Sequence, residues 1–355
     1  MENQLFIKSL IKSEGAISVA KFMNEAMFNQ FHGYYQTKKP IGKNADFITS
    51  PEISSIFGEL IARYFLGFIL QNNKKIAFVE MGAGLGTLAF DIISTFEKIS
   101  KKLGKLQELP EKLSFNIVEI SRELTKIQQE KLRDSTFKIN WFQDFDNFLK
   151  QNQNHQIYFL ANEVFDCFEI HQFARTNGKW QEILVSLKDE NFCLVLENFN
   201  EEKHNLINKI ALENEITKEG DVIFEHSFSA INFMQKLAKT IKIQGGIGLV
   251  IDYGYYDLPL KSTLQAVKNH QKTDVLANIG TSDLTALVNF RALDKTAKIN
   301  GLETSFITQG EFLRALGIEQ RQNLQDFETK AINRLINKEQ MGEIFKCLIF
   351  WEKII

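Results

Sequence analysis

A glycine-rich run between two apolar segments constrains the fold of this chain more than any other feature. The run Gly82-Ala83-Gly84-Leu85-Gly86 follows a short apolar segment that ends at Glu80, and an amphipathic segment with helical periodicity comes after it. Three glycines let the backbone turn sharply and approach a ligand, and the amides at the start of a helix can bind polar atoms. The run therefore predicts a strand, a loop and a helix that together form a ligand site.

The residues around these glycines distinguish between classes of cofactor. The spacing differs from the GxGxxG of nicotinamide enzymes, and no Lys-Ser or Lys-Thr pair follows, as a phosphate-binding Walker loop requires. Glu80 would repel a pyrophosphate but suits the ammonium group of an amino acid. Glu119 ends the next apolar run, where an acid can accept hydrogen bonds from both ribose hydroxyls. These features favour S-adenosylmethionine over NAD, with a tight turn beside two surface acids as the alternative.

From residue 75 onward, short apolar runs alternate with amphipathic segments, which is typical of repeated strand and helix units around a parallel sheet. We predict strands at 76–80, 115–119, 137–141, 157–161 and 248–252. We predict helices between them at about 88–102, 121–133 and 230–242. A helix at 290–299, a strand at 302–307, further helix to about 338 and a strand at 344–351 complete the pattern.

Two other regions depart from this alternation. Residues 1–70 have helical periodicity, and Thr49-Ser50-Pro51-Glu52 provides a cap, a first-turn proline and a glutamate for a capping box. Asn177-Gly178 between two β-rich runs predicts a hairpin, to which residues 192–196 can add a third strand. We therefore expect a helical extension over 1–70, a catalytic domain over 71–355, and a β-rich insertion at about 168–226 within that domain.

Composition excludes several functional classes. Lys and Arg number 42 against 44 Asp and Glu, so bulk charge does not attract the chain to nucleic acid. No apolar run approaches the ~18 residues of a membrane-spanning helix. The 3 cysteines lack the spacing of a disulfide framework or a zinc site, and no His, Asp or Glu set has metal-ligand spacing. The acidic amino terminus is unlike a transit or signal peptide, so we expect a cytoplasmic location.

Polar residues also follow the last two predicted internal strands. Asn162, Glu163 and Asp166 can orient a nucleophilic nitrogen, and the two carboxylates can clamp a guanidinium through charge-assisted hydrogen bonds. The alternative is that Asn162 and Asp166 cap turns and that Glu163 is solvated. Asp252 occupies the corresponding position after the fifth strand. His270 is a candidate proton acceptor, with a surface or hydrogen-bonded core histidine as its alternative.

Taken together, several segments resemble the MidA-like family of S-adenosylmethionine-dependent methyltransferases, whose mitochondrial members are complex I assembly factors. The resemblance extends over about residues 33–350, and its most family-specific segments are Asp46 to Glu52 and Asn162 to Asp166. Further matching segments are Gly33-Tyr34-Tyr35, Phe57-Gly58-Glu59, Glu80 to Thr87 with Asp91, Val118 to Ser121 with Gln128, Asp252-Tyr253-Gly254, Thr263-Leu264-Gln265 with His270, Asp283-Leu284-Thr285 and Gln309 to Gly317.

The resemblance implies an α/β fold, a Rossmann-like class I methyltransferase with a seven-stranded sheet, an amino-terminal helical extension and the β-rich insertion. It also implies methylation of an arginine on a protein substrate, a subunit of respiratory complex I. The chain departs from the family pattern at four places, with Cys167-Phe168-Glu169 for an Ala-Leu-Pro-like run, Asn289 for Asp, Ala45 for Gly and Ile279 for Pro. The first two concern substrate specificity rather than the cofactor loop, which is intact. Cys167 itself is expected to be a small buried residue rather than a nucleophile.

On this interpretation each candidate residue has an expected role. For the cofactor, the glycines would approach the amino-acid moiety of S-adenosylmethionine, with Glu80 at its ammonium and Glu119 at its ribose. For the acceptor, Glu163 and Asp166 would orient the guanidinium and His270 would remove a proton. The residues that complete the cofactor and acceptor sites are Gly82, Gly84, Gly86, Asp46, Asp252 and Asn162. A non-catalytic assembly chaperone with the same fold, or an NAD-dependent oxidoreductase, is the alternative, and the sequence leaves the target protein and the oligomeric state open.

Overall fold

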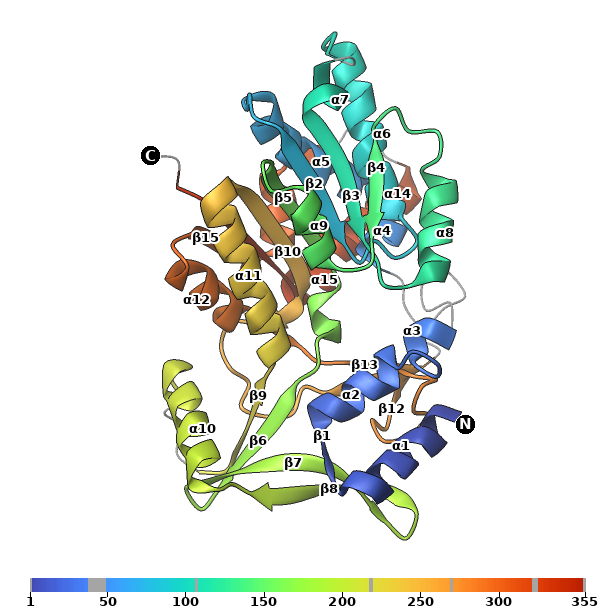
Figure 1. The fold of residues 1–355 in the computed structure, drawn as a ribbon. Coiled ribbons are helices and arrows are strands. Elements are labelled where there is room, and N and C mark those ends of the chain that lie inside the picture. The colour runs from blue at the N-terminus through green and yellow to red at the C-terminus, as the bar shows by residue number, and fades with distance from the viewer. Residues whose placement is uncertain are drawn as a thin grey trace.

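The computed structural model describes residues 2–37, 49–105, 108–216, 220–268, 271–320 and 325–353. Within them a mixed eight-stranded sheet forms the centre of the molecule (Figure 1). Its strands are β2 Ile76–Met81, β3 Leu113–Val118, β4 Ile139–Phe142, β5 Gln156–Asn162, β10 Gly246–Tyr255, β14 Val288–Asn289, β15 Glu303–Thr308 and β16 Phe345–Trp351. They follow the order β15-β16-β10-β5-β2-β3-β4, and β14 also pairs with β10.

The direction of the strands confirms the predicted fold class. Strands β10, β5, β2, β3 and β4 are parallel, whereas β16 is antiparallel to both β10 and β15. All the strands predicted for this sheet are present, with bounds shifted by a few residues. The fold is therefore α/β, a Rossmann-like class I methyltransferase sheet in which ligands collect at the carboxyl ends of the parallel strands.

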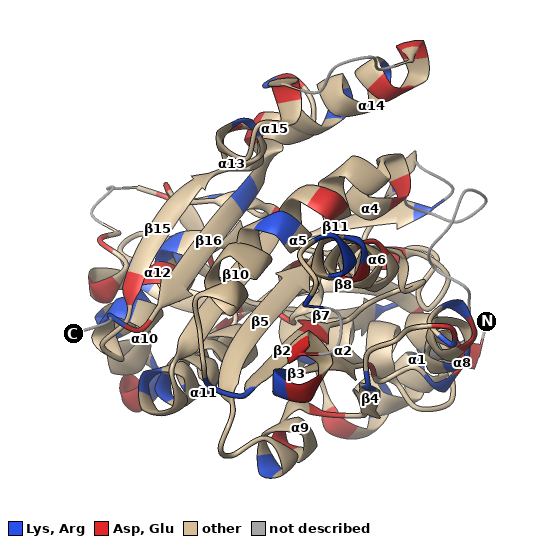
Figure 2. Cartoon of the chain, turned by 90° about the horizontal axis from the view of Figure 1, so that it is seen from above, with Lys and Arg blue, Asp and Glu red and all other residues tan. Residues whose placement is uncertain are grey.

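Helices cover both faces of this sheet (Figure 2). Strand β2 is apolar on both faces and so needs a helix layer on each. Its residues Ile76 and Phe78 pack into one apolar cluster, and Ala77 and Val79 pack into another. The first cluster includes helices α5 Ser55–Leu70, α6 Thr87–Lys102, α13 Gln309–Ala315 and α14 Asp326–Ile336. The second includes α9 Phe145–Gln151, α11 Phe228–Gln244 and α12 Phe290–Ile299. Shorter or peripheral helices are α7 Glu108–Lys112, α8 Arg122–Lys131, α15 Met341–Ile344 and the 3₁₀ turn Ile318–Gln320.

The predicted capping box at Thr49 is wrong. The Thr49 side chain makes no capping hydrogen bond, and the helix that it begins, α4, ends after one turn (Ser50–Ile53). Ser54 has extended backbone angles and caps α5 instead, because its hydroxyl accepts a hydrogen bond from the amide of Ile56. The expected single helix is thus two helices, and the break turns α4 toward the tip of the central sheet.

A second sheet lies beside the central one and carries the insertion. It comprises β6 His171–Thr176, β7 Lys179–Lys188, β8 Asn191–Asn198 and β9 Val222–His226, together with the short β1 Ile17–Ser18. Positive φ angles at Asn177 and Gly178 confirm the predicted hairpin turn. Helix α10 Glu201–Glu213 covers part of this sheet, and β11 Gln265–Lys268, β12 Gln271–Thr273 and β13 Asp283–Thr285 form a third, smaller one. No described helix is both long enough and apolar enough to cross a membrane.

The helices expected within residues 1–70 lie in two places. Helices α1 Glu2–Glu14 and α2 Val19–Phe28 pack against the second sheet, to which β1 adds a strand beside β7. Helix α3 Tyr34–Thr37 follows them toward the central sheet, whereas α5 belongs to the core of that sheet (Figure 1). The domain boundaries at 70 and at 168–226 stay a prediction.

Candidate active site

The glycine loop joins β2 to α6 in a conformation that requires glycine. Gly82, Gly84 and Gly86 have φ angles of 66°, 53° and 72°, in the left-handed region that side chains disfavour. A Cβ on Gly82 would lie 2.8 Å from Cγ2 of Val164, which leaves no room for a side chain. Gly86 is the amino-terminal cap of α6, so the loop ends on the free amides of that helix.

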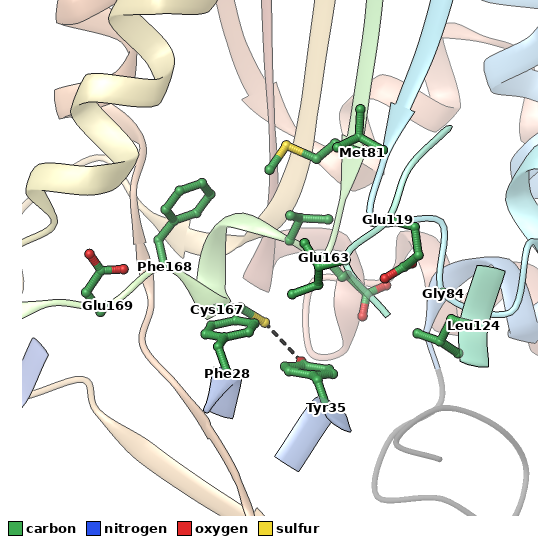
Figure 3. A pocket seen from close by; sticks show the side chains of 14 residues that line it. Phe28, Tyr35, Met81, Gly84, Glu119, Leu124, Glu163, Cys167, Phe168 and Glu169 are labelled. Carbon is green, nitrogen blue, oxygen red and sulfur yellow. Dashed lines mark hydrogen bonds between the residues drawn. The ribbon is translucent and has the colours of Figure 1, made fainter. Parts of the chain in front are cut away.

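A cavity of about 330 Å³ opens beside this loop, at the carboxyl ends of β2, β3 and β5 (Figure 3). Its walls carry three carboxylates, those of Glu119, Glu163 and Glu169, and no Lys or Arg of the described residues lines it. The other lining residues are Phe28, Tyr35, Met81, Gly82, Gly84, Val118, Ile120, Leu124, Val164, Cys167 and Phe168. Such a cavity favours a ligand that is positively charged and largely apolar.

Glu119 is held in place by Gln128 of helix α8. The Gln128 amide donates hydrogen bonds to Oε2 of Glu119 at 3.0 Å and to the carbonyl of Gly84 at 2.9 Å. The amide of Ser121 donates to the other Glu119 oxygen at 2.9 Å. Each carboxylate oxygen keeps a further lone pair, so Glu119 can still accept the two hydroxyls of a ribose. The sequence did not assign a role to Gln128. It follows Leu124 by one helical turn and lies on the same buried face of α8, and this spacing could have indicated a buried amide.

Glu80 lies in a second, smaller cavity of about 50 Å³ on the other side of the loop. Its Oε2 atom is buried without a hydrogen-bond partner among the described residues. Burial, aided by the negative charges of Glu119 and Asp91, raises the pKa of Glu80 to about 8. An ammonium group placed here would give this carboxylate the partner that it lacks.

The residues around the glycine loop fit S-adenosylmethionine. The unpartnered Glu80 suits the ammonium of the methionine moiety, and Glu119 suits the ribose. Gly82, Gly84 and Glu163 line both cavities, so a ligand that passes over the glycine loop reaches from one into the other. We propose that Glu80, Gly82, Gly84 and Glu119 hold the cofactor.

Glu163 follows β5 and faces the larger cavity (Figure 3). Its φ of 55° is rare for a residue with a side chain and marks a sharp turn at the strand end. The Ser50 amide donates to Oε1 of Glu163 at 2.8 Å, and the Asn162 side-chain amide donates to the same oxygen at 3.2 Å. Burial and the nearby Asp166 raise the pKa of Glu163 to about 7. Asn162 lines the smaller cavity and leaves its own Oδ1 unpartnered among the described residues.

Asp166 and Asp252, both predicted at the site, line neither of these two cavities. The Tyr253 hydroxyl donates to one oxygen of Asp166, and the Cys167 thiol donates to the other at 3.3 Å. Oδ2 of Asp252 accepts hydrogen bonds from three successive amides, those of residues 164, 165 and 166, at 2.9–3.1 Å. Burial raises the pKa of both aspartates. The structure therefore places them behind the wall of the cavity, where they hold the 3₁₀ turn Phe165–Cys167.

Tyr35 and Phe28 reach the cavity from the amino-terminal helices, and neither was predicted at the site. The Tyr35 hydroxyl hydrogen-bonds the Cys167 sulfur at 3.1 Å, and its ring stacks on Phe28 with centroids 5.4 Å apart. Burial raises the pKa of the Cys167 thiol well above its ordinary value, so it is a neutral hydrogen-bonding group. The sequence did contain a signal for Tyr35, because the segment Gly33-Tyr34-Tyr35 was part of the family resemblance.

Asp46 and His270, two further candidates, lie outside the described residues.

Comparison with known proteins gives the family. A family model described as a putative S-adenosyl-L-methionine-dependent methyltransferase matches residues 60–308. The chain is 33% identical to protein arginine methyltransferase NDUFAF7, mitochondrial, from Danio rerio, covering 96% of this chain and 84% of that protein. It is 30% identical to the Homo sapiens protein of the same name, covering 94% and 80%.

A solved structure supports the same fold. It is a likely methyl transferase from Burkholderia thailandensis bound to S-adenosyl-homocysteine, and it superposes with a TM-score of 0.83. The two sequences are 22% identical, and the superposition covers 99% of this chain and 92% of the other. This likeness extends to the second sheet as well as the central one, because nearly the whole chain is covered.

These comparisons correct one expectation from the sequence. The predicted cytoplasmic location is contradicted, because the relatives from Danio rerio and Homo sapiens are both named as mitochondrial proteins. Other expectations are confirmed, since the chain is an enzyme of the methyltransferase class and its cofactor is S-adenosylmethionine. The family model spans well over half of the chain, and the Danio rerio relative covers 96% of it. The chain belongs to the MidA-like family of S-adenosylmethionine-dependent methyltransferases.

Proposed function

We propose that this enzyme methylates a guanidinium nitrogen of an arginine in a protein substrate. The observation that carries the proposal is the position of Glu163, a partly buried carboxylate that lines both cavities, in a site without a lining Lys or Arg among the described residues. A guanidinium carries its charge at neutral pH and presents a planar set of donors to a carboxylate. The names of the relatives from Danio rerio and Homo sapiens, protein arginine methyltransferases, support the same acceptor. Following the family resemblance, we propose a subunit of respiratory complex I as the substrate.

S-adenosylmethionine, when bound, supplies an electrophilic methyl group, so the protein has to position the acceptor rather than activate the donor. Glu163 accepts a hydrogen bond from the guanidinium and directs one nitrogen toward the glycine loop. Ser50 and Asn162 fix the orientation of this carboxylate through the bonds to Oε1. The free Oε2 is therefore the oxygen that meets the acceptor.

The proton released in the reaction also has a destination. As the new bond between nitrogen and the methyl carbon forms and the bond between that carbon and sulfur breaks, the acceptor nitrogen loses one proton. Glu163, whose pKa is raised to about 7, can take that proton at neutral pH. Asp166 and Asp252 do not contact the acceptor. They are positioning residues that hold the turn behind Glu163.

A methyl-transfer assay tests this function directly. Purified enzyme is incubated with methyl-labelled S-adenosylmethionine and a lysate of cells that lack the protein, and the labelled band is analysed by mass spectrometry. Methylarginine in a complex I subunit is the expected result. Label on lysine or another residue would refute arginine as the acceptor, and label on an unrelated protein would refute the complex I substrate. The Glu163→Gln variant serves as the matched control, because it keeps the shape of the site but removes its charge.

A further inference from the structure

The larger cavity has two ends. Figure 3 shows Gly84, Glu119 and Leu124 at one end, and Phe168 and Glu169 at the other, with Glu163 between them. The first end belongs to the cofactor site, because it contains the glycine loop and the ribose-binding Glu119. The second end therefore receives the acceptor.

The acceptor end is built from the segment in which this chain departs from its family pattern. Cys167, Phe168 and Glu169 all line the cavity. The turn before them is fixed by Asp252, and Phe168 packs on Phe165 and Phe233 with ring centroids 5.2 and 5.8 Å apart. The Glu169 carboxylate is thus presented from a rigid wall rather than from a mobile loop.

The opposite side of this end is apolar and aromatic. Phe28 and Tyr35 stack on each other below Glu163 in the view of Figure 3, and the hydrogen bond from Tyr35 to Cys167 joins them to the segment that carries Glu169. A long side chain can lie against these rings while its charged end reaches Glu163. The acceptor end is therefore a slot for a flexible aliphatic stem with carboxylates at two points along it.

The Glu169 side chain is unpaired within the part of the chain that the structure describes. Among the described residues no hydrogen bond or ion pair holds its carboxylate, although the side chain is partly buried in the cavity wall. Glu119 is committed to the ribose and Glu163 to the reacting guanidinium, which leaves one carboxylate unassigned. A partly buried carboxylate gains most from a cation that arrives with the ligand.

We propose that Glu169 is a specificity-determining residue that binds a second positive charge of the acceptor. The substrate is then a basic segment of protein, in which a Lys or Arg lies close in sequence to the methylated arginine. This inference rests on the proposed function, since it takes arginine as the reacting residue. Proline, which the family pattern has at this position, would offer no such contact.

Synthetic peptides test the proposal. Each contains one central arginine in a glycine background, with a lysine placed one or two positions before or after it, and each has a matched peptide with glutamine in place of that lysine. Dissociation constants are measured by calorimetry with the full chain saturated with S-adenosylhomocysteine, for wild type and Glu169→Gln. The control is Glu197→Gln, an exposed glutamate on β8 that does not line the cavity.

We expect at least one lysine peptide to bind wild type about fivefold more tightly than its glutamine match. Glu169→Gln should reduce that ratio to below twofold, and Glu197→Gln should retain it. Equal binding of all matched pairs by wild type, the same ratio in Glu169→Gln, or no binding of any peptide would overturn the proposal.

The same peptides separate this proposal from the proposed function. They are incubated with S-adenosylmethionine and examined for methylarginine by mass spectrometry. A charge preference that depends on Glu169, without methylarginine, supports the role of Glu169 and counts against arginine methylation. Methylarginine without a charge preference supports arginine methylation and counts against the role of Glu169.

Discussion

The backbone amide of Ser50 donates a hydrogen bond of 2.8 Å to the carboxylate of Glu163, across 113 residues of sequence. The first residue of α4 therefore orients the carboxylate at the tip of β5. Ser50 is fully buried, so this bond is shielded from water. The amino-terminal segment thus contributes to the chemistry of the site as well as to its enclosure.

Replacement of Glu163 by glutamine tests its role in the reaction. The amide keeps an oxygen for the Ser50 bond but removes the charge that attracts the guanidinium and the group that takes its proton. Methyl transfer should fall at least roughly tenfold, an increase in the barrier of ~1.4 kcal/mol, while affinity for the cofactor stays within about twofold. Single-turnover rates and calorimetry measure the two quantities. A wild-type rate of transfer would remove Glu163 from the mechanism.

Glu119 is expected to contribute to cofactor binding through the ribose. Glu119→Ala should weaken binding of S-adenosylmethionine by about 1.5 to 3 kcal/mol, because two charge-assisted hydrogen bonds are lost. Gln128 still donates to the carbonyl of Gly84 in this variant, so the loop retains a support. Calorimetry gives the affinity, and circular dichroism shows whether the protein is folded. Unchanged affinity in a folded variant would contradict the assignment.

Gly82 and Gly104 form a matched pair for the glycine loop. Both have positive φ, at 66° and 70°, but a Cβ on Gly82 would meet Val164 at 2.8 Å, whereas a Cβ on Gly104 meets nothing within 4 Å. Each alanine variant should lose about 1 kcal/mol or more of stability through backbone strain. Only Gly82→Ala should also weaken cofactor binding, by at least about tenfold, because it shifts the loop. Equal affinities in the two variants would show that the loop does not contact the cofactor.

The raised pKa of Glu80 predicts how stability depends on pH without cofactor. Burial moves the pKa of this carboxyl from 4.5 to about 8, so the folded protein holds a proton that the unfolded chain has released. Its contribution to stability is complete below pH 4.5 and is lost as the pH rises through 8. Glu80→Gln stays neutral, so its free energy of unfolding relative to wild type should increase by roughly 2 kcal/mol or more between pH 5 and pH 8.

Urea unfolding at several pH values measures this difference. Addition of S-adenosylmethionine should make wild type more stable than Glu80→Gln at pH 8, because the ammonium of the cofactor pairs with the ionised Glu80. Parallel stability curves over the whole pH range would show that Glu80 is already ionised in the folded protein.

Sequence alone located the carboxylates at the ends of β2 and β3, because parallel strands bring their carboxyl ends to one edge of a sheet. It did not separate Glu163 from Asp166 and Asp252, which also follow strands. That distinction depends on the positive φ of Glu163, which directs one carboxylate to the cavity, and on the backbone amides that occupy Asp252. No local pattern reports either contact.

The amino-terminal helices illustrate a second limit. Their helical periodicity was visible, but the face against which they pack was not. Strand β1 has only two residues, and its partner in β7 is formed by residues near 185. The stacked pair of Phe28 and Tyr35 enters the cavity from helices that pack on residues far away in the sequence. Packing partners that distant leave no signal in a short window of sequence.

The apolar cluster that anchors these helices has a consequence for biosynthesis. It combines Ile7 and Phe22 with Val185 and extends as far as Ala286, so it can close only after most of the chain has been made. At ~5–20 residues per second, roughly 15–60 s pass between the appearance of its first and last members on the ribosome. Until residues 174–185 have been made, the apolar faces of α1 and α2 lack their native partners in the second sheet. The early helices therefore acquire their final contacts among the last events of folding.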